Sequence, residues 1–332
     1  MLNMSEDHRS LALTSFIIFA LLSSLIAVVP ALQMQQSVQP LSKAKDLTAQ
    51  ERDGLHTYIA EGCVACHTQQ VRNIEMDKIW GDRPSLPSDY YYSKQRMGIW
   101  RQSPSLLGSE RTGPDLTNIG KRQPSQDWHL IHLYNPRIVV KESVMPSYAW
   151  LFKEVWKADS TDVKVNVPKK FLQDTTKTVI ATERALHLVQ YLQSLQQVDP
   201  SFAIEAFIPS TKSKAFEESS VADAEIDGKS LYTQHCATCH QPSGEGLAGA
   251  FPPLKGSSIV NDENYELMAK IILQGYDARP DYGVMPALGG QLSDAEIAAI
   301  MNYERNSWGN EAPKVTKTDI KRIRDFVDAL NQ

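Results

Sequence analysis

The chain has 332 residues, of which 42% are hydrophobic and 22% are charged, with a formal net charge of -5. This length suffices for two ordinary domains, and the composition is typical of a globular protein rather than a disordered or polytopic membrane protein. The negative charge would repel a polyphosphate backbone, and no large Lys/Arg cluster offsets it, so nucleic-acid binding is excluded.

The amino-terminal segment predicts a membrane anchor within residues 1–33. Leu11 to Leu32 carry no charge, and a helix of this length matches a hydrocarbon core of about 30 Å. The alternative is a cleaved signal peptide with a site at Val29-Pro30-Ala31. It fits less well, because a signal peptide has a shorter apolar run behind a clearly basic segment, whereas Glu6 to Arg9 are mixed in sign.

All four cysteines fall in two copies of one pattern, Cys63-x-x-Cys66-His67 and Cys236-x-x-Cys239-His240. C-x-x-C followed by His is the attachment signature of c-type haem, whereas a thioredoxin-like motif needs a βαβ context. The two C-x-x-C pairs of a zinc ribbon lie roughly 15 to 20 residues apart, but these lie about 170 residues apart. The sequence therefore predicts two covalently attached haem c groups.

His67 and His240 are the predicted proximal iron ligands, because each follows the second cysteine of its motif. A hydrogen bond to the other imidazole nitrogen fixes the ring of such a ligand. We expect the carbonyl groups of Pro114 and Pro252 to accept these bonds. The remaining histidines lie off the repeated pattern and are assigned surface or supporting roles: His8, His56, His129, His132, His187 and His235.

Met145 and Met285 are the predicted sixth ligands, since each precedes a proline in a loop after its Pro-x-Leu mark. A thioether ligand raises the reduction potential of a cytochrome c. Most methionines are core residues, but a stiff Met-Pro step outside a helical stripe fills a core poorly. In the first copy Met76 and Met97 are the fallback ligands, whereas Met268 in the second copy is expected to pack on an apolar helix face.

The same order of signals appears twice, which indicates an internal duplication. Each copy has a helix, the haem motif, a Pro-x-Leu mark, a Met-Pro step and a closing helix. Helices are expected at Thr48 to Ile59, Ala185 to Leu195, Gly228 to Gln234, Tyr265 to Leu273, Ser293 to Asn306 and after Thr316, with Ser293 as an amino-terminal cap. We predict an all-α fold with domains at 34–208 and 226–332, joined by a polar linker at 209–225.

Orientation in the membrane follows from the cysteine chemistry rather than from charge. Arg9 precedes the span while Lys43, Lys45 and Arg52 follow it, slightly against the positive-inside expectation. Thioether attachment of haem c takes place outside the bacterial cytoplasmic membrane. Both haem domains are therefore expected to face the periplasm or exterior from a single span.

Residues 50–196 resemble the membrane-anchored mono-haem subunit II of cbb3-type haem-copper oxygen reductases. The shared phrases are YIAEGCVACHTQQVR, RTGPDLTNIGKR, WHLIHLYNPR and KESVMPSYAWLF. The final 110 or so residues resemble class I cytochrome c domains. The resemblance implies that Cys63, Cys66, His67 and Met145 hold one haem. It also implies partners: a catalytic haem-copper subunit with other membrane subunits, and a soluble cytochrome or similar donor.

The predicted function is electron transfer from a soluble donor to the catalytic subunit of a terminal oxygen reductase, with no catalytic residues in this chain. The family normally stops after one haem, so this chain would add an electron-entry cytochrome. Residues 68–112, with Trp80, Tyr90, Tyr91, Tyr92 and Trp100, form either a docking surface or an extra layer over the haem edge.

Three other functions stay open at this point. The chain could serve a nitric oxide reductase, whose cytochrome subunit also has one span, or could be a free membrane-anchored shuttle. A dihaem peroxidase is disfavoured, because paired methionine ligands leave no open iron position for substrate.

Overall fold

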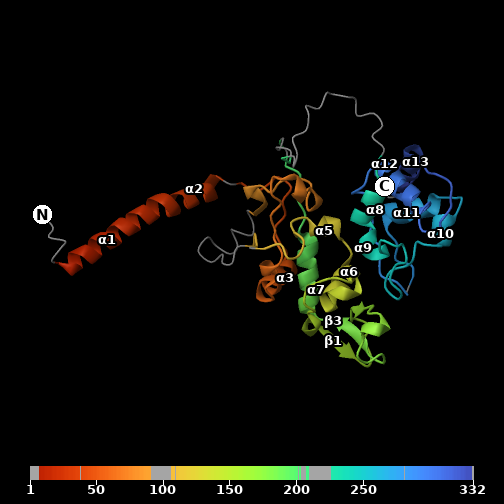
Figure 1. The fold of residues 1–332 in the computed structure, drawn as a ribbon, viewed down its shortest axis with the longest axis horizontal. Helices are drawn as coiled ribbons and strands as arrows, with labels where there is room; N and C mark the ends of the chain where they lie inside the picture. Colours follow the sequence, from red (N-terminus) through yellow and green to blue (C-terminus); the bar gives the residue numbers. More distant parts are fainter. Residues whose placement is uncertain are drawn as a thin grey trace. The chain divides into compact units, whose positions relative to one another are not determined.

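The computed structural model describes residues 7–37, 39–90, 106–108, 110–200, 202, 207–208, 226–279 and 281–330 (Figure 1). The chain divides into two units. The anchor unit comprises Met1–Asp46, Ser85–Ser103 and Val198–Glu205, and the main unit comprises Leu47–Pro84, Pro104–Gln197 and Ala206–Gln332. Both C-x-x-C-H motifs belong to the main unit.

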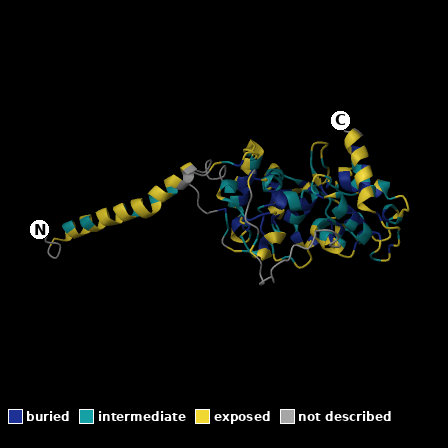
Figure 2. Ribbon diagram, turned by 90° about the horizontal axis from the view of Figure 1, so that it is seen from above, coloured by how far each residue is buried: buried dark blue, intermediate teal, exposed yellow. Residues whose placement is uncertain are grey.

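The anchor unit begins with one long apolar helix. It consists of α1 (His8–Ser23), a π-helical turn η1 (Ser24–Val28) and α2 (Val29–Ser37). The turn precedes Pro30, whose ring would clash with the carbonyl four residues earlier in a regular helix. Residues His8–Gln33 are long and apolar enough to cross a membrane, and Figure 2 shows the helix exposed along its length. The same unit holds the short η4 (Pro87–Tyr90).

The helix that precedes the first haem motif packs against a later helix of the main unit. α3 (Ala49–Ala60) begins with a capping box of Thr48 and Glu51, and it packs on α7 (Glu183–Ser194). A Cβ at Gly54 would lie 2.0 Å from the carbonyl oxygen of His187, so only glycine permits this approach. Leu55, Leu130 and Leu188 lie in the centre of the first core. The predicted helices at both positions are confirmed within two residues.

Shorter elements complete this part of the main unit. They are η2 (Cys63–Ala65), η3 (Glu75–Ile79), α5 (Ile119–Arg122), α6 (Gln126–Tyr134), η5 (Pro136–Ile138), η6 (Ala149–Leu151) and η7 (Lys169–Phe171).

A small antiparallel sheet departs from the all-α prediction. Its strands β1 (Phe152–Val155), β2 (Lys164–Val165) and β3 (Thr178–Ala181) run in the order β1-β3-β2, with Phe152 opposite Ala181 and Val165 opposite Val179. The strands are rich in β-branched side chains, which favour the pleated conformation. The cytochrome regions are helical, but the expectation of an all-α chain was incomplete.

The second haem motif belongs to a compact helical part of the main unit. Its helices are α8 (Gly228–His235), α9 (Ala237–His240), α10 (Ser258–Asn261), α11 (Glu266–Gln274), α12 (Asp294–Glu304) and α13 (Lys317–Leu330). Ile297, Ile300 and Met301 are buried in the second core, and Met268 packs there as predicted. Ser293 forms a capping box with Glu296, which confirms the predicted helix start.

Candidate haem sites

The first motif forms a tight turn at the end of α3. Gly62 adopts a left-handed conformation (φ +72°) and leads into η2, and the amide of His67 donates to the carbonyl of Cys63 at 3.0 Å. A residue with a Cβ adopts such a φ only with strain. Cys63 is half-buried and Cys66 is exposed. The turn thus carries both thiols and the imidazole within five residues.

The His67 imidazole is fixed from behind by the Gly113-Pro114 segment. Its Nδ1 lies 2.8 Å from the Pro114 carbonyl oxygen, which confirms the predicted hydrogen bond and leaves Nε2 for a metal. Burial lowers the pKa of His67, although the Pro114 bond and the Asp115 carboxylate oppose this. A Cβ at Gly113 would lie 2.3 Å from the His67 Cε1, so glycine is needed where the backbone lies against the ring.

The loop of Met145 packs on the first core beside the motif. Met145 and Cys63 are partly buried against the same core. The loop is attached to α6 by a hydrogen bond from the Tyr148 amide to the Leu133 carbonyl at 2.9 Å. The Tyr148 side chain hydrogen-bonds to Cys63, and burial raises the pKa of that thiol to about 12. The structure therefore brings the methionine loop to the predicted haem position.

The second motif has a corresponding arrangement on α8 and α9. The amide of His240 donates to the Cys236 carbonyl at 2.9 Å, and His240 Nδ1 lies 2.9 Å from the Pro252 carbonyl oxygen. This second predicted hydrogen bond is also confirmed. Burial lowers the pKa of His240, so the imidazole is neutral and can bind a metal through Nε2.

The four predicted ligands and attachment residues of the second site line one cavity. Cys236, Cys239, His240 and Met285 surround about 1350 Å³ of space, part of it open to solvent. Met285 and Tyr276 exchange two backbone hydrogen bonds of 2.9 Å, which fix the methionine loop. Two thiols on one side, a methionine loop and mainly apolar walls such as Ile272 and Leu288 fit a covalently held porphyrin.

Glu304 is a residue of this cavity that sequence reasoning missed. Its side chain hydrogen-bonds to Cys236, and burial raises its pKa to about 8. Glu304 follows Ile297 by seven positions on α12 and therefore falls on the buried stripe of that helix. That spacing could have identified it.

Of the alternative ligands that the structure describes, His235 lines the second cavity, and others have different surroundings. Met76 is 71% exposed, and Met97 lies outside the described residues. His129 is buried with its Nε2 2.8 Å from the Gln123 carbonyl oxygen, and His132 stacks on Trp128 at 4.5 Å. Within the described part of the chain, no group of three or more His, Cys, Asp or Glu side chains could hold a metal ion directly.

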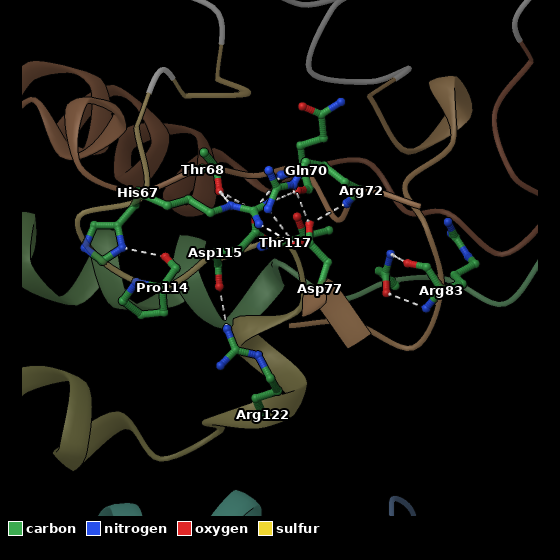
Figure 3. A network of polar contacts seen from close by, with 12 residues as sticks. His67, Thr68, Gln70, Arg72, Asp77, Arg83, Pro114, Asp115, Thr117 and Arg122 are labelled. Atoms are coloured by element: carbon green, nitrogen blue, oxygen red, sulfur yellow. Dashed lines mark hydrogen bonds and ion pairs between the residues drawn. The ribbon is translucent and has the colours of Figure 1, made fainter. Parts of the chain in front are cut away.

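Behind His67 lies a network of buried charges (Figure 3). Asp77 and Asp115 are both 0% exposed. Asp77 pairs with Arg72 at 2.9 Å and with Arg111 at 2.6 Å, and Arg111 also lies 3.6 Å from Asp115. Only Asp115 was noted in the sequence, as part of the Pro-x-Leu mark, because charged residues far apart in sequence give no local signal of pairing.

Comparison with known proteins identifies two families along the chain. Residues 3–191 match Cytochrome C oxidase, mono-heme subunit/FixO, and residues 223–303 match Cytochrome C oxidase, cbb3-type, subunit III. The first match covers the apolar helix and the first motif, and the second covers the second motif.

Individual relatives are cytochromes of several systems. The cytochrome c subunit of a quinone alcohol dehydrogenase from Gluconacetobacter polyoxogenes is 36% identical over 151 residues, 43% of this chain and 32% of the relative. Cytochrome c-552 of Thermus thermophilus is 35% identical over 119 residues, 31% of this chain and 78% of the relative. The chain thus spans about a third of the alcohol dehydrogenase subunit.

These findings agree with the geometry of the motifs. The apolar helix and the family together indicate a single-pass membrane protein. Because the first match extends over more than half of the 332 residues, the chain belongs to the mono-haem/FixO subunit family of cytochrome c oxidases and is an electron-transfer subunit carrying haem c.

Proposed function

We propose that this chain is a dihaem electron-transfer subunit of a terminal haem-copper oxygen reductase. Cys63 and Cys66 attach one haem c, and Cys236 and Cys239 attach the other. His67 with Met145, and His240 with Met285, are the axial ligands. The observation that carries this proposal is a second complete set, Cys236, Cys239, His240 and Met285, around one cavity in a chain of a mono-haem family.

The residues of each site suit electron transfer rather than bond-making chemistry. A bound haem iron supplies reversible one-electron chemistry. Each imidazole is oriented by the hydrogen bond from its Nδ1 to a proline carbonyl. Met145 and Met285 would supply the second protein ligand to each iron. Two protein ligands per iron leave no position for a substrate. The walls of the second site are mainly apolar.

We place the sites in the periplasm or exterior and the catalytic haem-copper subunit beside the anchor. Electrons enter from a soluble cytochrome or similar donor at the Cys236/Cys239 site and continue to the Cys63/Cys66 site. A methionine ligand gives a higher potential than histidine, so Met285→His should slow electron entry. Stopped-flow reduction by the donor measures this. If Met145→His slows electron entry instead, electrons enter at the Cys63/Cys66 site and the proposed order is reversed.

The partner surface remains a prediction. Of the aromatic residues in 68–112, Trp80 packs with its ring 5.1 Å from the Arg122 guanidinium. This contact within the chain favours the alternative in which the segment is an extra layer over the haem edge. Tyr91, Tyr92 and Trp100 lie outside the described residues.

Purification of the complex in mild detergent tests the function. We expect oxidase subunits to accompany the chain, and two haems per chain from its mass and haem content. Nitric oxide reductase subunits in their place would favour that enzyme, and a lone chain would favour a free shuttle. One haem per chain would contradict the dihaem proposal. A mass that includes residues 1–33 would exclude cleavage of the apolar segment.

A further inference from the structure

Both chain segments that flank His67 are hydrogen-bonded to the segment that carries its proline acceptor. The Gly113 amide donates to the Cys66 carbonyl at 2.9 Å, and the Leu116 amide donates to the Thr68 carbonyl at 2.8 Å. The Pro114 carbonyl lies between these two bonds in the sequence. Its position relative to the His67 ring therefore depends on how firmly residues 113–116 are attached to residues 66–70.

Asp115 provides most of that attachment through its side chain. One carboxylate oxygen accepts from the Thr68 hydroxyl at 2.6 Å and the Gln70 amide at 2.8 Å, and the other accepts from the Thr117 amide at 2.8 Å. A buried carboxylate is stable only when hydrogen-bonded or paired. Three donors satisfy this carboxyl group, which lies next to the Pro114 carbonyl that supports His67.

Arg111 and Asp77 hold this carboxylate in place. Arg111 Nε donates to the Thr68 hydroxyl oxygen at 2.8 Å, and that hydroxyl donates in turn to Asp115. Asp77 binds Arg111 and Arg72. Burial alone would raise the pKa of Asp77, but hydrogen bonds from Arg72 and Arg111 keep it well below its usual range. The two acids and two arginines thus form one connected set, drawn in Figure 3.

Among the described residues, the proline segment of the second motif is not attached through a buried carboxylate. The position after Pro252 is Pro253, which has no carboxylate. There the segment is held by backbone bonds, including the Leu254 amide to the Gly244 carbonyl at 2.8 Å and the Gly246 amide to the His240 carbonyl at 2.9 Å. The second site therefore serves as an internal control for the Asp115 substitution, although it has a buried carboxylate of its own in Glu304.

We infer that Asp115 is a positioning residue for the first haem, which fixes His67 through the Pro114 carbonyl and lowers the midpoint potential of that haem alone. The inference rests on the proposed haem at Cys63 and Cys66. A firm bond to Nδ1 makes an imidazole a more basic ligand. The Asp115 side chain also offsets the positive charge of Arg111, which lies 3.6 Å away, so its removal would leave positive charge that disfavours the ferric state. Both effects act in the same direction.

Asp115→Asn in the full-length chain tests the inference. Potentiometric titration should show a higher midpoint potential for the first haem and an unchanged potential for the second. The two components are assigned with a Cys63→Ala/Cys66→Ala variant. The matched control is Asp82→Asn, which removes one carboxylate paired with Lys121 at a half-exposed position, and which should shift neither potential.

A second variant covers the case in which Asp115→Asn does not fold. Thr68→Val removes the hydroxyl between Asp115 and Arg111 without changing charge, and should raise the first potential by a smaller amount. The near-infrared band of methionine-ligated ferric haem reports whether ligation is kept. An unchanged first potential in the folded variant, or equal shifts of both haems, would overturn the inference. A chain that holds both haems but does not reduce an oxidase would contradict the proposed function. The potential shift of the variant could still be measured in that case, so the two failures can be told apart.

Discussion

The two haem-motif regions reach the same histidine geometry by different means. In the first, Asp115, Arg111 and Asp77 attach the proline segment through buried charge. In the second, backbone bonds and the amide of Asn310 do so, and the one buried carboxylate, Glu304, faces the cavity. The comparison teaches that the hydrogen bond to the imidazole is the shared requirement, while the charge around it can differ. If each region holds a haem as proposed, the two haems can thereby be given different potentials.

The largest expected effect comes from removing one attachment pair. Cys236→Ala/Cys239→Ala should remove the second haem and leave the first, because the thioether bonds are the covalent attachment. Mass spectrometry of the purified chain and a haem stain measure the loss. The matched variant Cys63→Ala/Cys66→Ala should remove the other haem. Retention of two covalent haems by either variant would contradict the assignment.

Glu304→Gln should change how stability depends on pH. The pKa of Glu304 in the folded protein, about 8, lies above the ordinary glutamate value of 4.5, so the unfolded state loses its proton first as pH rises. The wild type should therefore lose stability between about pH 4.5 and 8, by up to roughly 5 kcal/mol. The variant should show a flatter profile in denaturant unfolding monitored at the second haem. An equally steep profile would show that another group titrates.

Asn310→Ala should weaken the second region by about 3 kcal/mol, since buried polar groups would lose their partners. Its side chain is 3% exposed, donates to the carbonyls of Leu254 and Glu304, and accepts from the amide of Gly256. Denaturant unfolding followed at the second haem measures the loss. The first haem's potential is the control and should not move.

Gly113→Ala should have a smaller effect, about 2 kcal/mol, because the new methyl group would overlap the His67 ring. Thermal unfolding followed by the first haem's absorbance measures it. Gly290→Ala is the control, since nothing lies within 4 Å of a Cβ there. Equal melting temperatures for the two variants would show that the Gly113 contact can relax at no cost.

Much of the fold was predictable because local signals determine it. The C-x-x-C-H motifs, the Ser293 cap and the hydrogen bonds to Pro114 and Pro252 follow from short patterns. The sheet at 152–181 was missed, since its strands are only two to four residues long. The pairing of Asp77 with Arg111 could not be predicted, because the two residues lie 34 positions apart. Axial ligation by Met145 and Met285 stays a prediction.

The paired bonds around His67 also have a consequence for evolution. Cys66 and Thr68 are hydrogen-bonded to Gly113 and Leu116, so the two ends of the long segment between them lie side by side. Lengthening such a loop costs little, because closure entropy rises only with the logarithm of length. Residues that recognise a partner could therefore be inserted between Asp77 and Arg111 without changing the hydrogen bonds around His67.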